Sequence, residues 1–348
     1  MSTRTAYSRA LDLKNGVVEM SHGGGGRAMA QLIDQLFADA FANDILAQGN
    51  DQAAFDLPQG RVVMSTDSFV ISPLFFPGGN IGNLAVHGTV NDVALSGGTP
   101  LYLTAGFILE EGYPLKDLKI IVNSMAKAAR EAGVLIVTGD TKVVERGHGD
   151  GVYINTTGIG VVDEAINISG NRAQAGDKIL INGFVGDHGV AIMSLREGLG
   201  FESTIQSDCA SLNGLITDMV AAVPDIHVMR DPTRGGLAAT LNELAHQSGV
   251  GMVLNEDNIP IRDEVRGACE ILGLDPLYVA NEGKLLAICS AKDADRLLTA
   301  MRAHPLGEQS AIIGEVIEDK NNFVQMKTGF GGSRVVDWIA GEQLPRIC

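Results

Sequence analysis

Glycine clusters divide this chain into short segments, and they constrain its fold more than any other feature. Runs or pairs of glycine begin at positions 23, 78, 97, 235 and 331, and a Gly-x-Gly stands at 158. Such clusters mark tight turns and places where two backbones approach closely. No segment repeats with a fixed period, so a repeat architecture is not indicated. The pattern predicts a globular chain in which strands and helices alternate.

The first half of the chain mixes helices and strands. Helix-like spacing of apolar residues recurs in the segments 28–41, 83–96 and 116–132. Strand-like runs occur at 61–65, 101–109, 134–137 and 151–162. This order predicts an α+β domain.

The second half repeats the mixture. We expect strands at 178–182, 251–254, 277–280, 285–289 and 311–317, with helices near His188, after Gly236 and at 291–303. Ser333 is a plausible N-cap for a last helix ending at Gly341, and Pro345 prevents its extension. At 348 residues, two domains are expected. We predict domains at 1–168 and 169–341, and an extended tail at 342–348.

Charge and hydropathy exclude several classes of partner. The formal net charge is −16, which disfavours binding to nucleic acid or to an acidic membrane surface. The polar N-terminal stretch lacks the apolar core of a signal peptide, and no later run is long enough to span a bilayer. We therefore expect a cytoplasmic protein without a membrane partner. If it binds polyphosphate, it must use cations, backbone N–H groups and a few basic side chains.

One cysteine has an unusual position. The chain has four cysteines without a C-x-x-C pair, so a zinc site or a disulfide framework is not indicated, and Cys348 is the last residue. The seven residues from Glu342 can span about 23 Å, enough to carry this thiol into a neighbouring cleft. A carrier thiol on a swinging tail fits this arrangement, although a terminal cysteine can also arise by chance.

Aspartates just past apolar segments are the main candidates for a metal site. Asp67, Asp92 and Asp140 share this context, and Asp51 and Asp231 are further candidates. Magnesium prefers hard oxygen ligands and keeps phosphate oxygens and waters in its shell, so separate aspartates around a nucleotide suit it. Each aspartate could instead cap a turn or a helix.

Phosphate binding must rely on glycine loops, because the chain has no Walker A sequence. The first candidate loop contains Gly24, Gly25 and Arg27 ahead of an amphipathic helix, and the second contains Gly235 and Gly236. Exposed N–H groups at a helix N-terminus hold anions well. A flexible linker or a tight turn would explain such runs equally well.

Two further residues are candidates for catalysis. Lys142 follows Asp140 by two residues in an apparently extended segment, so both side chains should lie on one face. Glu282 and Lys284 have the same spacing around a glycine. Lys142 could also be an ordinary surface lysine, and Glu282 a turn carboxylate. The histidines show no ligand spacing, and we assign them no role.

Together, these motifs resemble the HypE family of hydrogenase maturation proteins. The resemblance rests on SHGGGG, STDSFVISPLFFPGGNIG, HGTVNDVALSGGTP, GDTKVV, RDPTRGG, NEGK and the terminal PRIC, and it covers essentially the whole chain. Single elements also resemble the wider PurM-like superfamily of aminoimidazole ribonucleotide synthetase, selenophosphate synthetase and thiamine monophosphate kinase. The complete set with PRIC is far more specific than any one element.

The resemblance implies a PurM-like fold, with an N-terminal domain that forms a β-barrel with its mate in a homodimer and a C-terminal α/β domain. ATP would lie between the domains. Asp67, Asp92 and Asp140 would bind Mg²⁺, with Asp51 and Asp231 as further acidic ligands. Lys142 and Glu282 match residues that family members bring near the tail thiol.

The implied activity is an ATP-dependent dehydration. A HypF-type carbamoyltransferase would load Cys348 as an S-carboxamide, and ATP would activate the amide oxygen. Glu282 would act as general base and Lys142 would orient or polarise the group. The resulting cyano group would pass to iron on a HypC–HypD scaffold complex.

Two alternatives remain at this point. The chain could be another ATP-using member of the superfamily, although selenophosphate synthetases typically carry a reactive cysteine in the first glycine loop and here the first cysteine is Cys209. It could also be a non-enzymatic thiol carrier in which the aspartates only cap turns. That second alternative predicts no magnesium-dependent ATP turnover.

Overall fold

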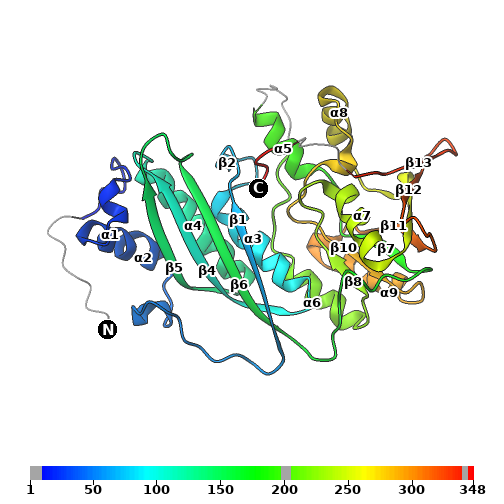
Figure 1. Cartoon of the computed structure of the whole chain (residues 1–348), viewed down its shortest axis with the longest axis horizontal. Helices are drawn as coiled ribbons and strands as arrows, with labels where there is room; N and C mark the ends of the chain where they lie inside the picture. The colour runs from blue at the N-terminus through cyan, green and yellow to red at the C-terminus, as the bar shows by residue number, and fades with distance from the viewer. Residues whose placement is uncertain (1–9, 197–204, 339–343) are drawn as a thin grey trace.

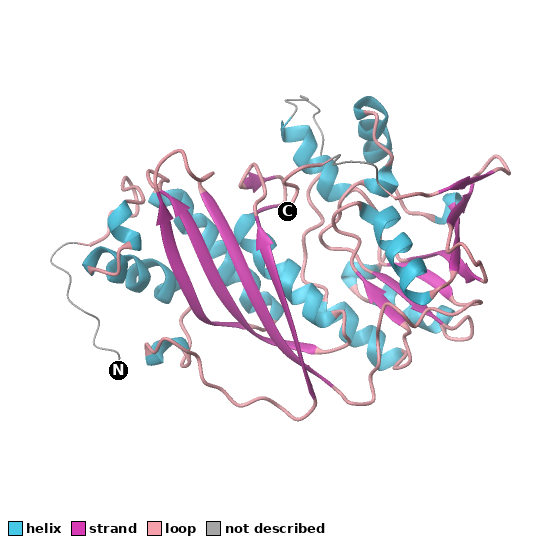
Figure 2. Cartoon of the chain, viewed as in Figure 1, coloured by secondary structure: helices cyan, strands magenta, loops and turns pink. Residues whose placement is uncertain are grey.

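The computed structural model describes residues 10–196, 205–338 and 344–348. They form two units that lie side by side, one on a four-stranded sheet and one on a seven-stranded sheet (Figures 1 and 2). Within these described ranges, no helix is long and apolar enough to cross a membrane.

The N-terminal unit is a sheet with helices on one face. The strand order is β1 (Arg61–Phe69), β6 (Val152–Val162), β4 (Thr99–Glu110) and β5 (Leu135–Val144), antiparallel except for the parallel pair β4 and β5. Helices α3 (Ile81–Ala94) and α4 (Leu115–Ala132) pack behind this sheet in Figure 1. Because side chains alternate along a strand, odd-numbered β4 residues such as Leu103 and Phe107 are buried under the helices.

The opposite face of this sheet carries exposed apolar side chains. Val62, Met64 and Ile108 are large hydrophobic residues on this face, and Met64 is 71% exposed. Soluble monomers seldom expose several such side chains together, so this face is a candidate contact surface.

The N-terminal glycine loop lies at the β5 edge of the sheet. It contains η1 (Met20–Gly23) and leads into α1 (Arg27–Leu32), η2 (Ile33–Phe37) and α2 (Ala38–Ala40), which confirms the predicted helix at 28–41. A Cβ atom at Gly23 would lie only 2.8 Å from the backbone nitrogen of Val143, so glycine is required for the loop to pack against β5.

The C-terminal unit is a mainly antiparallel sheet between helices. Its strands follow the order β13 (Ser333–Val335), β12 (Val324–Lys327), β9 (Gly251–Asn255), β11 (Ala311–Ile317), β7 (Lys178–Ile181), β10 (Leu286–Cys289) and β8 (Val228–Arg230). The expected α/β alternation is therefore present, but β9 and β12 are the single parallel pair among the pairings described.

Helices cover both faces of the second sheet. One apolar core includes α7 (Gly236–Ser248), and another includes α6 (Asn213–Ala222) and α9 (Ala294–Ala303). Helices α5 (Asp187–Arg196) and α8 (Asp263–Leu272) pack on each other at the side that faces the end of the chain (Figure 1).

Two predicted elements were wrong. The segment 277–280 is not a strand, because Pro276–Tyr278 form a 3-10 turn whose start is capped by the Asp275 side chain. Ser333 does not begin a helix; it begins β13, where pairing with β12 satisfies the backbone groups that a helix would have satisfied. Residues 339–341 of that predicted helix lie outside the described ranges.

The predicted extended tail is also corrected in part. Residues 342 and 343 lie outside the description, but 344–348 contain a turn rather than a straight strand. Arg346 lies in the left-handed region with φ 51°, which few non-glycine residues adopt. The chain therefore bends just before its last two residues.

Candidate active site

The end of the chain is folded back between the two units (Figure 1). Ile347 is 2% exposed, and Cys348 packs against the same apolar core as Ile347. The backbone nitrogen of Val70, just past β1, donates a hydrogen bond of 3.1 Å to a main-chain oxygen of Cys348. The last residue is thus half-buried beside the end of β1.

Glu282 is the principal acidic neighbour of this thiol. Its side chain is buried, and within the described ranges its Oε1 has no hydrogen-bond partner. A Cβ at Gly283 would come within 1.9 Å of the carbonyl oxygen of Asp208, so the glycine next to Glu282 permits close backbone contact. The Asn281 side chain donates 2.8 Å to the carbonyl oxygen of Pro232 and holds this loop against the loop of Asp231.

Three aspartates lie in one electrostatic neighbourhood with Glu282. Asp67 lies on the helix-covered side of β1, Asp92 belongs to α3 and accepts 2.8 Å from the hydroxyl of Ser65, and Asp231 follows β8. Burial raises the pKa of all three, and like charge adds to it for Asp92 and Asp231. The pKa of Asp231 rises to about 7, from burial first and Asp92 second.

The electrostatics of Glu282 and Cys348 connect this cluster to the tail. Burial, followed by the charges of Asp208, Asp231, Asp67 and Asp92, raises the pKa of Glu282 well above its ordinary value. Burial and then Glu282 raise the pKa of Cys348 to about 12, against the opposing effect of Arg234. In this position the thiol is protonated at neutral pH.

The donor chemistry of the three aspartates suits a hard divalent cation. Carboxylate oxygens are the ligands that magnesium prefers, and a cation would offset the repulsion that raises these pKa values. Within residues 10–196, 205–338 and 344–348, however, no three His, Cys, Asp or Glu side chains are already gathered into a metal-binding group. The three aspartates therefore have the right ligand chemistry for magnesium, and phosphate oxygens would have to complete the coordination shell of the ion.

Asp140 and Lys142 lie elsewhere. Both face the uncovered side of the four-stranded sheet, where Lys142 Nζ lies 2.5 Å from Asp140 Oδ2 and both side chains are mostly exposed. The hydrogen bond from Lys142 lowers the pKa of Asp140. The two side chains point the same way, as expected, but a single chain does not bring them to Cys348.

The two glycine loops are also separated. Gly24, Gly25 and Arg27 stand at the β5 edge, whereas Gly235 and Gly236 begin α7. A Cβ at Gly236 would meet the carbonyl oxygens of residues 277 and 279 at 2.6 Å, so this second loop packs directly against the segment that leads to Glu282. Asp51 lies on an exposed loop before β1.

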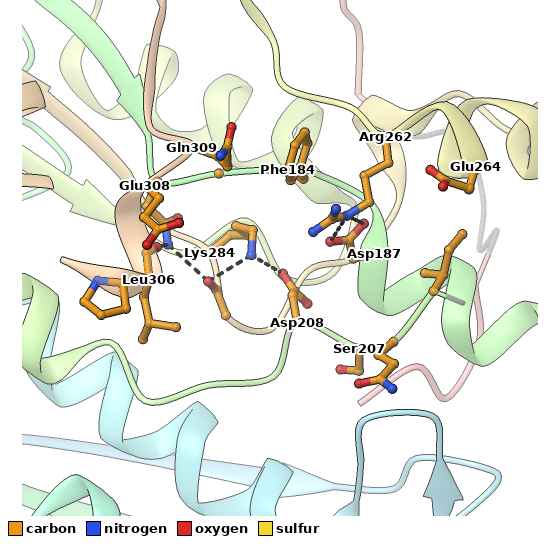
Figure 3. Close-up of a pocket in the computed structure, with 16 residues that line it drawn as sticks. Phe184, Asp187, Ser207, Asp208, Arg262, Glu264, Lys284, Leu306, Glu308 and Gln309 are labelled. Carbon is orange, nitrogen blue, oxygen red and sulfur yellow. Dashed lines mark hydrogen bonds and ion pairs between the residues drawn. The ribbon is translucent and has the colours of Figure 1, made fainter. Parts of the chain in front are cut away.

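A cavity of about 620 Å³ adjoins the site within the C-terminal unit (Figure 3). Its wall contains an ion pair in which Lys284 Nζ lies 3.0 Å from Asp208 Oδ2. The other oxygen of Asp208 accepts 3.1 Å from the backbone nitrogen of Glu282. Lys284 therefore faces the cavity and, through Asp208, helps to fix the backbone of Glu282, which does not line that cavity.

Sequence reasoning missed four residues around the tail: His188, Arg196, Ser207 and Asp208. Asp208 follows a serine and precedes a cysteine in an irregular segment, and no spacing marks it. His188 lies at a glycine-rich helix start, which was noted without a role. His188 and Arg196 contact the last residues of the chain, whereas Ser207 contacts His188 and Asp208 contacts Glu282, and these contacts become visible only in three dimensions.

Comparison with known proteins gives a consistent assignment. The family described as AIR synthase related protein, N-terminal domain, matches residues 49–162, and the corresponding C-terminal domain family matches 174–327. The carbamoyl dehydratase HypE of Azotobacter vinelandii is 69% identical over 338 residues, covering 97% of this chain and 99% of that protein.

Solved structures agree with these matches. The crystal structure of hydrogenase maturation protein HypE in complex with ATP is 52% identical, with a TM-score of 0.92 over 95% of this chain and 99% of that one. The HypE chain of a HypE–HypF complex is 50% identical, with a TM-score of 0.78 over 88% and 99% of the two chains. A PurM-like two-domain fold of mixed helices and sheets is therefore established.

Proposed function

The chain belongs to the HypE family of hydrogenase maturation proteins, and from that membership we propose that it is an ATP-dependent carbamoyl dehydratase acting on its own Cys348. The observation that carries the proposal is the half-buried terminal thiol beside Glu282, whose charge is the largest electrostatic influence on the thiol after burial. A residue of the chain itself would thus serve as the substrate carrier.

The proposed reaction converts an S-carboxamide on Cys348 into a thiocyanate. The amide oxygen attacks the γ-phosphorus of ATP, the bond to the bridging oxygen breaks, ADP leaves and the nitrogen loses one proton. The carbon–oxygen bond then breaks, phosphate leaves with that oxygen, and loss of the second N–H proton completes the carbon–nitrogen triple bond. Phosphorylation replaces a poor leaving group by a good one. The cyano group would become the cyanide ligand of the [NiFe]-hydrogenase iron centre.

Glu282 is the proposed general base. Its Oε1 lacks a hydrogen-bond partner within the described part of the chain, so it can accept a proton without breaking an existing contact. The causes that raise its pKa also make its carboxylate a stronger proton acceptor. Lys142 would orient or polarise the carboxamide.

The nucleotide would be held by carboxylates and glycine loops. We propose Asp67, Asp92, Asp140 and Asp231 as Mg²⁺ ligands, with Asp51 as a further acidic contact. Magnesium, when bound, would offset the negative charge of the phosphates. N–H groups of Gly24, Gly25, Gly235 and Gly236, together with Arg27, would hold phosphate oxygens. The ATP complex of a HypE relative supports nucleotide binding in this family.

A homodimer would account for the position of Asp140 and Lys142. Both lie on the uncovered sheet face, which also carries Val62 and Met64. We propose that two copies join these faces into an intermolecular β-barrel, with an interface more apolar than ordinary surface. Asp140 and Lys142 would then lie inside the assembly, and their roles in the site require the second copy.

We further propose that the chain divides into domains 1–168 and 169–341 and a tail 342–348, and that it acts in the cytoplasm. A HypF-type carbamoyltransferase loads the tail, in keeping with the HypE–HypF complex of a relative, and a HypC–HypD complex receives the product.

The direct test is intact mass spectrometry. The protein is incubated with Mg-ATP, carbamoyl phosphate and the carbamoyltransferase, with Cys348→Ala as control. An ATP-dependent adduct with the mass of cyanide, present at Cys348 and missing from the control, supports the proposal. A carboxamide that persists after ATP is added would mean that the chain is only a thiol carrier.

A further inference from the structure

The docked tail is held by its main chain. The main-chain oxygen of each of the residues 345–348 accepts at least one hydrogen bond. Arg196 donates to the first two, and His188 donates to the third with Nε2 at 2.8 Å. The backbone nitrogens of Val70 and Ser72 donate to the fourth and the second, respectively. Contacts of this kind recognise the path of the chain rather than its side chains.

Arg196 joins three parts of the molecule. Its Nε donates 2.6 Å to the carbonyl oxygen of Ser72, and its Nη1 donates 2.6 Å to the carbonyl oxygen of Pro345. Its Nη2 donates to the carbonyl oxygen of Arg346. The rigid planar fork of a guanidinium suits several acceptors at once, which a lysine cannot match. The last residue of α5 thus bridges the N-terminal unit and the tail.

His188 is held in one tautomer. A carbonyl oxygen can only accept, so the contact with Ile347 requires a proton on Nε2. Nδ1 lies 2.7 Å from the hydroxyl of Ser207, which donates to it in the neutral imidazole and in turn accepts from the backbone nitrogen of Cys209 at 3.1 Å. Nε2 already carries a proton, so His188 does not take one from Glu282 here. Its role is to hold the tail.

The tail pays a conformational cost for this position. Arg346 adopts φ 51°, which is unfavourable for a residue with a side chain. Its Nε donates 2.9 Å to the carbonyl oxygen of Val70, and its guanidinium pairs with Asp150. Release of the tail would relieve this strain, so the docked state depends on the contacts that oppose it.

We propose that His188 and Arg196, at opposite ends of α5, form a clamp that binds the main chain of the tail and holds Cys348 in the site during dehydration. The inference rests on the proposed function for its catalytic consequence, but the clamp itself is a structural claim. None of these hydrogen bonds involves the Cys348 sulfur, so the clamp is suited to a tail with a free or a loaded thiol.

The test measures docking without reference to catalysis. Full-length protein is treated with iodoacetamide, and alkylation of Cys348 is followed by peptide mass spectrometry in wild type, Arg196→Ala and Arg196→Lys. The matched control is Arg266→Ala, an exposed arginine of the neighbouring helix α8. Losing the charged donor should speed alkylation by about tenfold or more, and lysine should restore docking only in part. The control should behave as wild type.

His188 is tested with a pair of variants because its side chain is fully buried. His188→Gln retains an N–H donor near the Nε2 position and should keep alkylation slow, whereas His188→Leu removes the donor and should make it fast. Equal rates in these two variants, or a rate unchanged by Arg196→Ala, would overturn the clamp.

The catalytic consequence is measured separately. Protein preloaded as the S-carboxamide receives Mg-ATP in a single turnover, and conversion to the cyanide is followed by intact mass. Arg196→Ala should slow conversion by about tenfold while loading by the transferase is unchanged or faster. Loss of loading and conversion together would indicate a folding defect and count against the clamp. If the wild-type protein forms no cyanide, but Arg196→Ala still speeds alkylation of Cys348, the proposed function is wrong and the clamp is supported.

Discussion

Oε1 of Glu282 lies 3.9 Å from Nε2 of His188, and the two side chains are buried together beside the end of the chain. The imidazole donates its proton to the carbonyl oxygen of Ile347 instead of to the carboxyl group. Glu282 Oε1 is therefore left without a hydrogen-bond partner in the described part of the chain, while His188 holds the segment that ends at Cys348.

Replacing Glu282 by glutamine should separate nucleotide binding from product formation. The variant keeps the shape of the side chain but loses the proton acceptor, so ATP should bind while cyanide formation falls by roughly a hundredfold or more. Single-turnover mass spectrometry measures this step. Glu308→Gln, at the exposed rim of the neighbouring cavity, is the control. Full product from Glu282→Gln would dismiss the residue as base.

Replacing Asp92 by asparagine should abolish ATP turnover. It removes one carboxylate from the group that we propose as magnesium ligands, and a lost electrostatic contact to a phosphoryl group typically costs about a hundredfold or more in rate. Release of ADP is the measurement. Asp56→Asn, on an exposed segment, should leave the rate unchanged. Near-normal turnover in Asp92→Asn would remove that residue from the metal site.

The docked thiol should resist alkylation over the accessible pH range. Burial, followed by the charge of Glu282, raises the pKa of Cys348 from 9.0 to about 12. The preference of the docked state for the protonated thiol therefore contributes its full stability below pH 9. This contribution is lost as the pH rises through 12. At pH 8, Cys348 in native protein should react roughly a thousandfold more slowly than in denatured protein. Its rate should keep rising above pH 9, where an ordinary thiol levels off. A plateau near pH 9 in the native state would contradict this.

The buried pair of Lys284 and Asp208 should be sensitive to the loss of one partner. Lys284→Met leaves Asp208 buried without its cation, which we expect to lower the free energy of unfolding by about 3 kcal/mol. Urea denaturation measures it. The double variant with Asp208→Asn should recover part of the loss, because the uncompensated charge is gone. Equal stability of the single and double variants would argue against the pair.

The uncovered sheet face should mediate dimer formation. Met64→Lys introduces a charge at the most exposed apolar position of β1 and should convert a dimer to a monomer in sedimentation experiments. Ile120→Lys makes the same change on α4, whose side chain is exposed on the opposite side of the sheet. A dimer that survives Met64→Lys but dissociates with Ile120→Lys would assign the interface to the helical face.

Much of the fold could be predicted from local patterns. The strands at 101–109, 151–162 and 311–317 and the helices at 83–96 and 116–132 were confirmed within a few residues, because periodicity and glycine boundaries agree there. A secondary-structure prediction was wrong where another segment of the chain supplied the backbone hydrogen-bond partners. Ser333 has the chemistry of a helix cap, but pairing with β12 made it a strand residue.

The candidate site divides in the same way. The sequence by itself determined which residues are candidates for the chemistry: acidic side chains after apolar segments, glycines such as Gly283, and a thiol at the chain end. These candidates can be recognised from side-chain chemistry and local backbone geometry, and both are encoded within a short sequence motif.

Only the tertiary structure decided which of these residues meet. It gathers Asp67, Asp92, Asp231 and Glu282 around Cys348, and it leaves Asp140 and Lys142 on the other face of the sheet. It also recruits His188 and Arg196, which bind carbonyl oxygens that every residue possesses. Because hydrogen bonds to the main chain do not depend on side-chain identity, the recognised segment carries no sequence pattern. This part of the site could therefore be identified only from the tertiary structure.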